Sequence, residues 1–279
     1  LRLVPGDPAR MMLGERATPE SVEALREQLG LNQPLWQQFV DFVVRLVTTG
    51  DTGASLQYGV PTSQLVLDRA PITLTLVGLA VLFSILIAIP LGILAARNDT
   101  ASKIIRPVLD FLQTMPAFVY LIPALMLFRI GVVPGIVATV VFALAPGVRL
   151  TELGIRGVDR EVVEAGHAFG ATPRRILRQI QLPLAMPSIM AGVNQVIMLS
   201  LSMVVIAGMV GAGGLGGDVV KSLSSIDVGL GVEAGLSVVI LAMILDRITG
   251  AFGTGKKRAA ARKDRAARRA PAPAIGKAA

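Results

Sequence analysis

The feature that most limits the possible folds of this chain is an uninterrupted run of uncharged, mostly apolar residues at positions 70–96. Its 27 residues include no Asp, Glu, Lys or Arg. As an α-helix, such a run extends roughly 40 Å, whereas the hydrocarbon core of a bilayer is about 30 Å thick. Over the whole chain 53% of residues are hydrophobic and only 16% are charged, which is unusual for a water-soluble domain. The sequence therefore predicts an all-α, polytopic transmembrane helical bundle.

Five stretches are long and apolar enough to cross a membrane, and we predict spans at 72–96, 108–128, 131–149, 184–208 and 229–250. The uncharged run at 182–217 has 36 residues, which is too long for one span. We expect it to break in the glycine-rich stretch 208–217. Several prolines fall inside the predicted spans, and membrane helices tolerate them because neighbouring helices satisfy the freed backbone groups.

Lys and Arg concentrate in alternate loops, and this asymmetry predicts the orientation of the spans. They are frequent in 97–107, in 150–181 and in the C-terminal tail, whereas the other loops contain only Arg129 and Lys221. We therefore expect the basic loops and the C-terminus in the cytoplasm, and residues 1–70 outside it. Because the chain begins at Leu1 rather than at a methionine, we expect a first transmembrane helix to precede this external segment.

The external segment 1–70 has the pattern of amphipathic helices. Thr18 is placed to cap a helix that Pro19 begins and Gly30 ends. Residues 34–47 predict a second amphipathic helix, with Trp36 as an interfacial anchor.

The net charge of +8 comes from the tail, because residues 256–279 contain nine Lys or Arg and one acid, and the rest of the chain is neutral. The tail contains no aromatic residue that could stack on bases. We interpret residues 251–279 as a disordered cytoplasmic segment beside an anionic membrane surface, and do not expect nucleic-acid binding.

Two glycine-rich patterns mimic nucleotide sites. GAGGLG at 211–216 lacks the strand and βαβ unit that a dinucleotide site needs. GAFGTGKK at 250–257 has Lys257 where a P-loop needs Ser or Thr. The chain has no cysteine and one histidine, His167, so we expect no catalytic residues, no metal site and no bound cofactor.

The polar residues Glu233 and Asn194 lie within predicted spans and are candidates for a translocation path. An ionisable residue in a span is a functional candidate by default. For Glu233, structural pairing or an interfacial position near the end of its span is the alternative.

The segment 159–183, DREVVEAGHAFGATPRRILRQIQLP, predicts a helix, a turn and a second helix. Val162, Val163, Ala165 and Phe169 form one apolar side of the first helix. Gly170 allows the turn, Thr172 is placed as a cap and Pro173 begins the second helix. Such a hairpin could lie on the bilayer surface, or it could present a short helix to the groove of a cytoplasmic partner.

This segment resembles the EAA loop of ABC-importer permeases, in which an acid-Ala-Ala triplet is followed by a glycine and closed by Leu-Pro. The matching residues are Glu164, Ala165, Gly166, Gly170, Ala171, Leu182 and Pro183. Gly166 stands where the pattern has a second alanine. The resemblance implies that the loop is a coupling helix that docks into an ATPase subunit. It also implies that the glycine makes the turn and that the glutamate and small residues fit the ATPase cleft.

The resemblance extends over nearly the whole chain, in two directions. Residues 90–250 resemble permeases of glycine betaine/proline-type osmoprotectant importers, through RPVLDFLQTMPAFVYLIPALMLF at 106–128 and QLPLAMPSIMAGVNQ from residue 181. Residues 3–75 resemble the outer segment of dipeptide/oligopeptide permeases, through LVPGDPARMMLGE and GDTGASLQYGVPTSQ.

Both resemblances imply the permease subunit of a type I ABC importer in a bacterial inner membrane. The implied partners are cytoplasmic ABC ATPase subunits, a second permease subunit in a homo- or heterodimer, an extracytoplasmic substrate-binding protein and the lipid bilayer. ATP would be hydrolysed by the ATPase subunit, so this chain is not expected to be an enzyme. The favoured substrate is glycine betaine or proline, and the alternative is a dipeptide or oligopeptide. A membrane receptor or membrane enzyme is the alternative of a different class.

Overall fold

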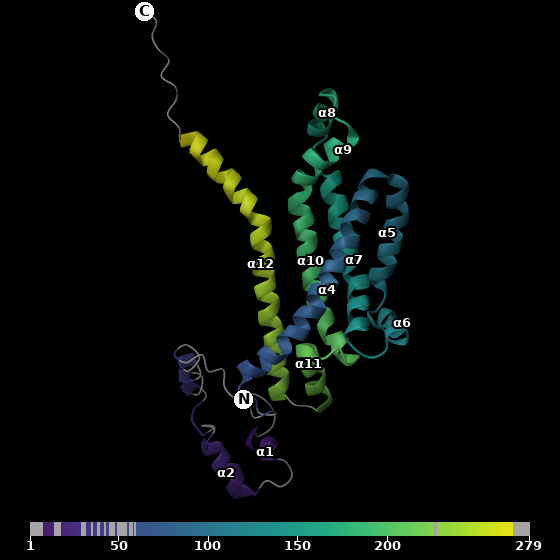
Figure 1. The fold of residues 1–279 in the computed structure, drawn as a ribbon. Helices are drawn as coiled ribbons and strands as arrows, with labels where there is room; N and C mark the ends of the chain where they lie inside the picture. The colour runs from purple at the N-terminus through teal and green to yellow at the C-terminus, as the bar shows by residue number, and fades with distance from the viewer. Residues whose placement is uncertain are drawn as a thin grey trace, which may run out of the picture. The chain divides into compact units, whose positions relative to one another are not determined.

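The computed structural model describes residues 8–13, 18–28, isolated positions between 32 and 58, 60–225 and 228–269. The regular elements of these residues are all helices, which confirms the predicted all-α class (Figure 1). In order they are α1 (Pro8–Leu13), α2 (Pro19–Gln28), α4 (Thr62–Arg97), α5 (Asp99–Thr114), α6 (Phe118–Phe128), α7 (Val132–Arg156), α8 (Arg160–Ala168), α9 (Pro173–Ile176), the π-helical turn η2 (Leu177–Gln181), α10 (Leu182–Met209), α11 (Gly214–Ser225) and α12 (Val228–Arg269).

The chain divides into two compact units, and the long helices contribute to both. The first comprises Leu1–Phe83, Thr114–Phe142 and Leu199–Ala242. The second comprises Ser84–Gln113, Ala143–Met198 and Met243–Ala279.

In the first unit, α6, α7 and α10 pack around Leu121, Ala138 and Met203, which are almost completely buried. The chain breaks between α10 and α11, within the predicted glycine-rich stretch. Gly208 on α10 lies against the backbone of Gly216 on α11, where a Cβ added to Gly208 would stand 2.5 Å from the carbonyl oxygen of Gly216. These two glycines therefore allow a close approach of two helix backbones.

In the second unit, α4, α5, α7 and α10 pack around two buried clusters of apolar side chains: Ala88, Leu109, Ala145 and Val148 in one, and Ile155, Leu177, Ala185 and Ile189 in the other. Small residues bring these helices close together. A Cβ on Gly92 of α4 would stand 2.5 Å from the Cβ of Thr151 on α7, and one on Gly154 of α7 would stand 2.7 Å from the Cβ of Ser188 on α10. Small residues at helix contacts are typical of membrane helices, which gain stability from close packing.

The observed helices differ from the predicted spans at several boundaries. Among the described residues, four helices are long and apolar enough to cross a membrane, and the number of spans rises to five if the bent pair of α5 and α6 is counted as one span. The span predicted at 108–128 is interrupted, because α5 ends at Thr114 and α6 begins at Phe118. Pro116 lies in this break, and a proline disfavours the helical conformation of the residue before it.

The C-terminal part also differs from the prediction, since α12 continues to Arg269. Residues 251–269 were expected to be disordered because of their charge, but they are rich in Ala, Arg and Lys, which are strong helix formers. The remaining tail lies outside the described residues.

The first predicted helix of the external segment is confirmed as α2. Thr18 Oγ1 accepts a hydrogen bond from the Ser21 backbone N–H at 3.3 Å, and Ser21 Oγ accepts one from the Thr18 N–H at 3.0 Å. These reciprocal bonds form a capping box. Most of the second predicted helix, 34–47, lies outside the described residues; Trp36 is described and is 67% exposed.

Candidate functional site

The predicted hairpin of residues 159–183 forms, and local hydrogen bonds cap both ends of its first helix, α8. The Asp159 side chain caps α8 by accepting a hydrogen bond from the Glu161 N–H at 3.3 Å. At the other end Gly170 has φ +74°. Its N–H bonds the His167 carbonyl, and the Ala171 N–H bonds the Gly166 carbonyl, which is the Schellman pattern that ends helices at a glycine. The turn predicted at Gly170 is therefore confirmed.

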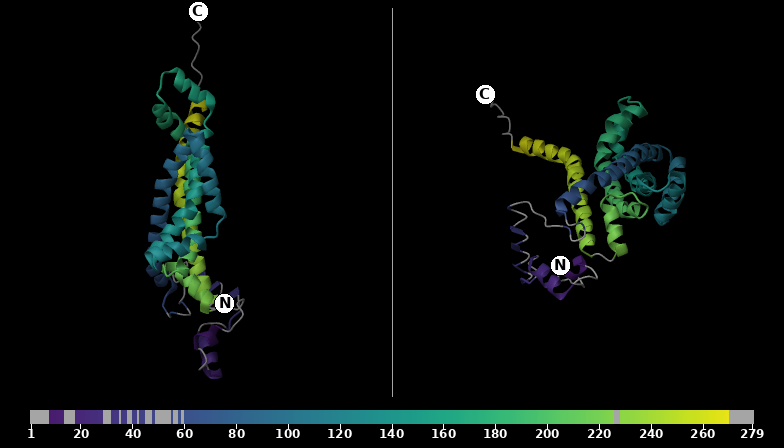
Figure 2. Two further views of the ribbon diagram at one scale, coloured as in Figure 1. Left: turned by 90° about the vertical axis from the view of Figure 1, so that its right-hand side faces the viewer. Right: turned by 60° about the horizontal axis from the view of Figure 1, so that its bottom comes forward.

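The second arm of the hairpin is continuous with a membrane helix. Thr172 occupies the position before Pro173 as predicted, but its side chain makes no capping hydrogen bond. From Pro173 the helix continues through the π-helical turn η2 into α10 and ends at Met209. Figures 1 and 2 show α8 and α9 projecting beyond the turn between α4 and α5. A displacement of the hairpin would therefore reach α10 without an intervening loop.

Gly166 closes the hairpin against its own second arm. It is buried, and a Cβ there would stand 2.8 Å from Ile180 Cδ1 and 3.4 Å from Ile176 Cγ1. A larger residue would therefore require the Ile180 side chain to shift. The small size of Gly166 therefore serves the packing of the hairpin itself, while its neighbours Glu164 and Ala165 are exposed.

The apolar side predicted for α8 faces outward. Phe169 is 91% exposed and Val162 is 41% exposed. Of the other residues that match the EAA pattern, Gly170 and Pro183 are exposed, and Ala171 and Leu182 are half-buried. An exposed apolar side chain of this size costs free energy in water, and such surfaces mark interaction sites when they gather. The hairpin can therefore bind either a protein groove or a membrane surface.

A groove of about 500 Å³ lies where the hairpin joins the membrane helices. Its lining includes Leu153 and Gly157 from the end of α7 and the segment after it, Val162 from α8, and Leu184 and Ser188 from α10. The base of the hairpin is held by the buried cluster of Ile155, Leu177, Ala185 and Ile189.

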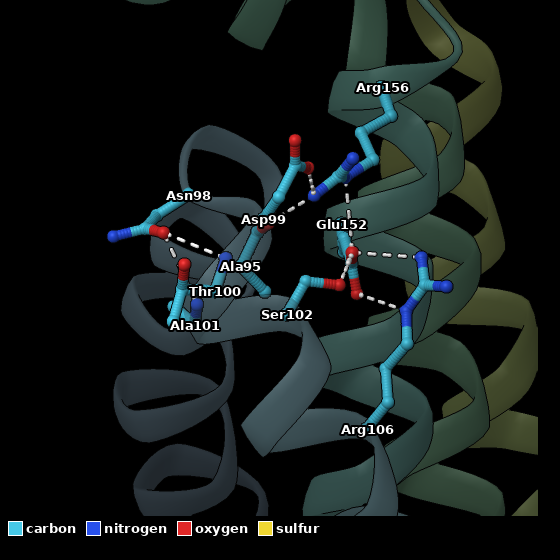
Figure 3. A network of polar contacts seen from close by, with 9 residues as sticks. All are labelled: Ala95, Asn98, Asp99, Thr100, Ala101, Ser102, Arg106, Glu152 and Arg156. Atoms are coloured by element: carbon cyan, nitrogen blue, oxygen red, sulfur yellow. Dashed lines mark hydrogen bonds and ion pairs between the residues drawn. The ribbon is translucent and has the colours of Figure 1, made fainter.

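An ionic network with a buried centre lies close to this base and was not predicted from the sequence (Figure 3). Its centre is Glu152 on α7, which is 2% exposed. Ser102 Oγ donates a hydrogen bond to Glu152 Oε1 at 2.7 Å, Arg106 Nη2 donates one to the same oxygen at 2.9 Å, and Arg156 Nε lies 3.1 Å from it. Residues 150–181 were interpreted as a loop, so Glu152 was not considered. The sequence feature that could have identified Glu152 is its spacing from Arg156, which lies one helical turn further along the chain.

Asn194, a candidate for the translocation path, joins two helices of the second unit. Its Nδ2 donates a hydrogen bond to Asp246 Oδ1 at 2.7 Å, and Thr249 Oγ1 donates one to Asn194 Oδ1 at 2.9 Å. Hydrogen bonds between polar side chains of this kind hold membrane helices together. In this chain they connect α10 to α12 at Asn194.

Glu233, the other candidate, lies on α12 in the first unit and is half-buried. Its backbone carbonyl accepts a hydrogen bond from Ser237 Oγ at 2.6 Å. Within the described residues, no group of three or more His, Asp or Glu side chains is placed to hold a metal ion.

A second polar cluster, in the first unit, surrounds Asp218 on α11 and was also missed. Asp218 is 5% exposed. Its carboxylate accepts a hydrogen bond from the Tyr58 hydroxyl at 3.4 Å and lies 3.5 Å from Arg69 Nε. Lys221 Nζ donates to the Tyr58 hydroxyl at 2.9 Å and lies 4.6 Å from the centre of its ring. The cluster attaches the end of the external segment to α11.

Comparison with solved structures supports the fold. The structure of the MetNI methionine ABC transporter in an inward-facing conformation matches with a TM-score of 0.61 at 22% identity, over 70% of this chain and 96% of that chain. This likeness shows the helical fold of a type I ABC-importer permease.

Comparison with known sequences shows close relatives. The chain is 57% identical over 186 residues to the glycine betaine/proline betaine transport system permease protein ProW of Escherichia coli (strain K12), covering 67% of this chain and 52% of ProW. It is 52% identical over 185 residues to the glycine betaine transport system permease protein OpuAB of Bacillus subtilis (strain 168), covering 66% of each. The chain thus spans between about half and two thirds of the length of these relatives.

Two family matches cover most of the chain. Residues 1–77 match the family described as binding-protein-dependent transport system membrane component, N-terminal. Residues 88–258, more than half of the chain, match the family described as binding-protein-dependent transport system inner membrane component. The chain therefore belongs to the binding-protein-dependent transport system inner membrane components.

Proposed function

We propose that this chain is the permease subunit of an ATP-driven ABC importer that moves a small osmolyte, such as glycine betaine or proline, into a bacterial cell. The observation that carries this proposal is the 57% identity over 186 residues to a permease of a glycine betaine/proline betaine transport system. Its partners are cytoplasmic ABC ATPase subunits, a second permease subunit and an extracytoplasmic substrate-binding protein. ATP is bound and hydrolysed by the ATPase subunits, and the C-terminus of this chain lies in the cytoplasm.

The α8–α9 hairpin is the proposed contact with the ATPase subunit. Its support is the exposed pair of Phe169 and Glu164 beside the turn at Gly170. Burying Phe169 in a groove of the partner removes its apolar surface from water, and Glu164 adds a charge that can select a basic partner surface. Closure of two ATPase subunits around ATP would then draw two such hairpins together.

The membrane helices would convert this movement into alternating access. Because α9, η2 and α10 form one helix from Pro173 to Met209, movement of the hairpin tilts or shifts α10 directly. The interruptions at Pro116 and at the glycines between α10 and α11 let neighbouring helices change their angle without melting.

The distribution of charge supports an osmolyte with a permanent positive charge. Between residues 180 and 250 the only Lys or Arg residues are Lys221 and Arg247, and the Lys221 ammonium contacts Tyr58. A quaternary ammonium ion cannot lose its charge by deprotonation, so a path with few fixed cations suits it. A dipeptide carries an amine and a carboxylate, and requires more polar partners than these helices provide.

Substrate uptake by the intact complex tests this proposal. The complex is purified through an affinity tag on this chain and reconstituted in vesicles with its binding protein. We expect ATP-dependent uptake of radiolabelled glycine betaine, and none with a non-hydrolysable ATP analogue. Uptake of a labelled dipeptide without uptake of glycine betaine would show that the peptide-permease resemblance of residues 3–75 was the better guide to the substrate.

A further inference from the structure

A polar network centred on the buried carboxylate of Glu152 connects three helices of the second unit. On α5 it accepts hydrogen bonds from Ser102 and Arg106, and on its own helix, α7, it pairs with Arg156. Arg156 extends the network, because its Nη2 lies 2.8 Å from Asp99 Oδ1 at the start of α5 and donates a hydrogen bond at 2.8 Å to the Ala95 carbonyl near the end of α4. Figure 3 shows these groups converging between the helices.

The start of α5 is itself held in place for this contact. The Asn98 side chain caps α5 by accepting hydrogen bonds from the backbone N–H groups of Thr100 and Ala101, at 2.9 and 3.3 Å. The cap sets the direction in which Asp99 and Ser102 leave the helix. Asp99 and Ser102 therefore reach Arg156 and Glu152 on α7 from a fixed first turn of α5.

The network lies directly before the hairpin in the chain. Arg156 is the last residue of α7, and α8 begins at Arg160. The backbone N–H of Gly157 still bonds the Leu153 carbonyl at 2.8 Å, and Val158 packs against the buried cluster at the hairpin base. A force on α8 therefore acts on the turn of α7 that bears Glu152 and Arg156.

The charges of this network balance, because the carboxylates of Glu152 and Asp99 face the guanidinium groups of Arg106 and Arg156. A buried ion pair adds little stability compared with well-packed apolar side chains, but it fixes one geometry when its hydrogen bonds are satisfied. Apolar contacts such as those of Leu109 and Val148 between α5 and α7 have no directional requirement, so they resist sliding of the helices less than the ionic contacts do.

We propose that Glu152 is a positioning residue that makes the end of α4, α5 and the last turn of α7 move as one body with the α8–α9 hairpin. The coupling role of the hairpin rests on the proposed function, but the mechanical linkage is a property of this chain alone. When the hairpin is displaced, Glu152 and Arg156 carry the displacement to α5 and α4. Without the carboxylate, the hairpin and α10 can move while α5 stays behind.

The test is a Glu152→Gln variant of the whole complex, which keeps the side-chain size and loses the charge. We expect transport of glycine betaine per ATP hydrolysed to fall by about threefold or more, because coupling energies carried by such networks change by amounts of this order. The amount of ATPase subunit that co-purifies should remain unchanged. Asp110→Asn is the matched control: it removes the ion pair of Asp110 with Arg149, which joins the same two helices but is exposed, and it should leave the ratio unchanged.

A measurement without transport separates the linkage from the proposed function. Spin labels at Thr100→Cys on α5 and Thr172→Cys in the hairpin, both exposed positions, report the distance between them. We expect one narrow distance distribution with Glu152 and a broader one with Glu152→Gln. An equally narrow distribution in the variant would overturn the linkage, even if the wild-type complex transports no glycine betaine. Conversely, a broadened distribution in a complex that does not transport supports the linkage and contradicts the proposed function.

A milder variant covers the case in which Glu152→Gln does not insert. Asp99 is largely exposed, with 81% of its side chain accessible, so Asp99→Asn removes one contact of Arg156 without burying an uncompensated group. It should broaden the same distance distribution in the same direction, but less. If Glu152→Gln cannot be produced, a distance distribution that stays equally narrow in Asp99→Asn would also overturn the proposal.

Discussion

Arg106 forms a bidentate ion pair with Glu152, in which its Nη2 donates to Oε1 at 2.9 Å and its Nε donates to Oε2 at 3.3 Å. Paired hydrogen bonds of this kind combine charge with a fixed orientation. The pair joins α5 to α7 at positions 46 residues apart in the sequence, and one of its members is almost completely buried.

The first prediction concerns this pair. Arg106→Gln should lower the thermal unfolding temperature of the purified protein, because the buried Glu152 carboxylate loses its bidentate partner. Arg149→Gln removes the partner of the exposed Asp110 and should lower it less, since exposed ion pairs contribute little. Unfolding in detergent, followed by loss of the monodisperse peak on heating, measures both. Equal shifts would mean that the burial of Glu152 does not matter.

The second prediction concerns the hairpin turn. Gly170→Val should strain the backbone by about 1–2 kcal/mol or more, because a side chain at positive φ approaches the carbonyl oxygen. Membrane insertion should persist, while co-purification of the ATPase subunit and transport should fall. Asn tolerates this conformation better than other residues with side chains, so Gly170→Asn is the matched control and should retain most of both. Wild-type transport by Gly170→Val would indicate a hairpin that only lies on the membrane surface.

The third prediction tests the packing of the two arms. Gly166→Ala places a methyl group against Ile180 Cδ1, so that the Ile180 side chain must shift, and we expect this repacking of the hairpin to reduce ATPase co-purification. Ile180→Val removes that terminal carbon, so the double variant should recover binding. Pull-down of the ATPase subunit measures both. Failure of Ile180→Val to restore binding would mean that Gly166 meets the partner directly.

The fourth prediction concerns the close approach of α10 and α11. A methyl group on Gly216 would stand 2.2 Å from the Val204 carbonyl oxygen, and backbone atoms cannot move aside as a side chain can. We expect Gly216→Ala to destabilise the protein by about 1–3 kcal/mol, the usual cost of overpacking. At Gly217, on the same helix, the added methyl group would meet no atom within 4 Å apart from its chain neighbours and its own helix backbone, so Gly217→Ala should unfold at the wild-type temperature or slightly above it, because Ala favours a helix more than Gly does. Thermal unfolding of the two variants side by side decides the point.

The fifth prediction concerns orientation. The chain has no cysteine, so single cysteines at the exposed positions Thr100, Thr172 and Ser224 can be labelled selectively. With the basic loops in the cytoplasm, an impermeant thiol reagent should label Ser224→Cys in intact cells, and Thr100→Cys and Thr172→Cys only after permeabilisation. Labelling of Thr172→Cys from outside would reverse the orientation and remove the hairpin from reach of a cytoplasmic ATPase.

The sequence alone predicted the features that arise from short-range physics. Uncharged runs such as 70–96 identify membrane helices because burying charge in lipid is costly, and α4 contains this run. Gly170 and Pro173 marked the hairpin turn because positive φ and a missing N–H are properties of single residues. The EAA pattern around Glu164 identified the family for the same reason, since its spacing lies within one hairpin.

Other features were decided only by the tertiary structure, because they depend on which helix faces which. Nothing local to Glu152 shows that Ser102 and Arg106, 50 and 46 residues away, would satisfy its charge. Likewise, nothing local to Asn194, a candidate for the translocation path, shows that Asp246 and Thr249 lie beside it. A polar residue in a span is a functional candidate in the sequence, but its hydrogen-bond partners come from distant helices, and only the packing of those helices determines whether it holds the bundle together or remains available to a substrate.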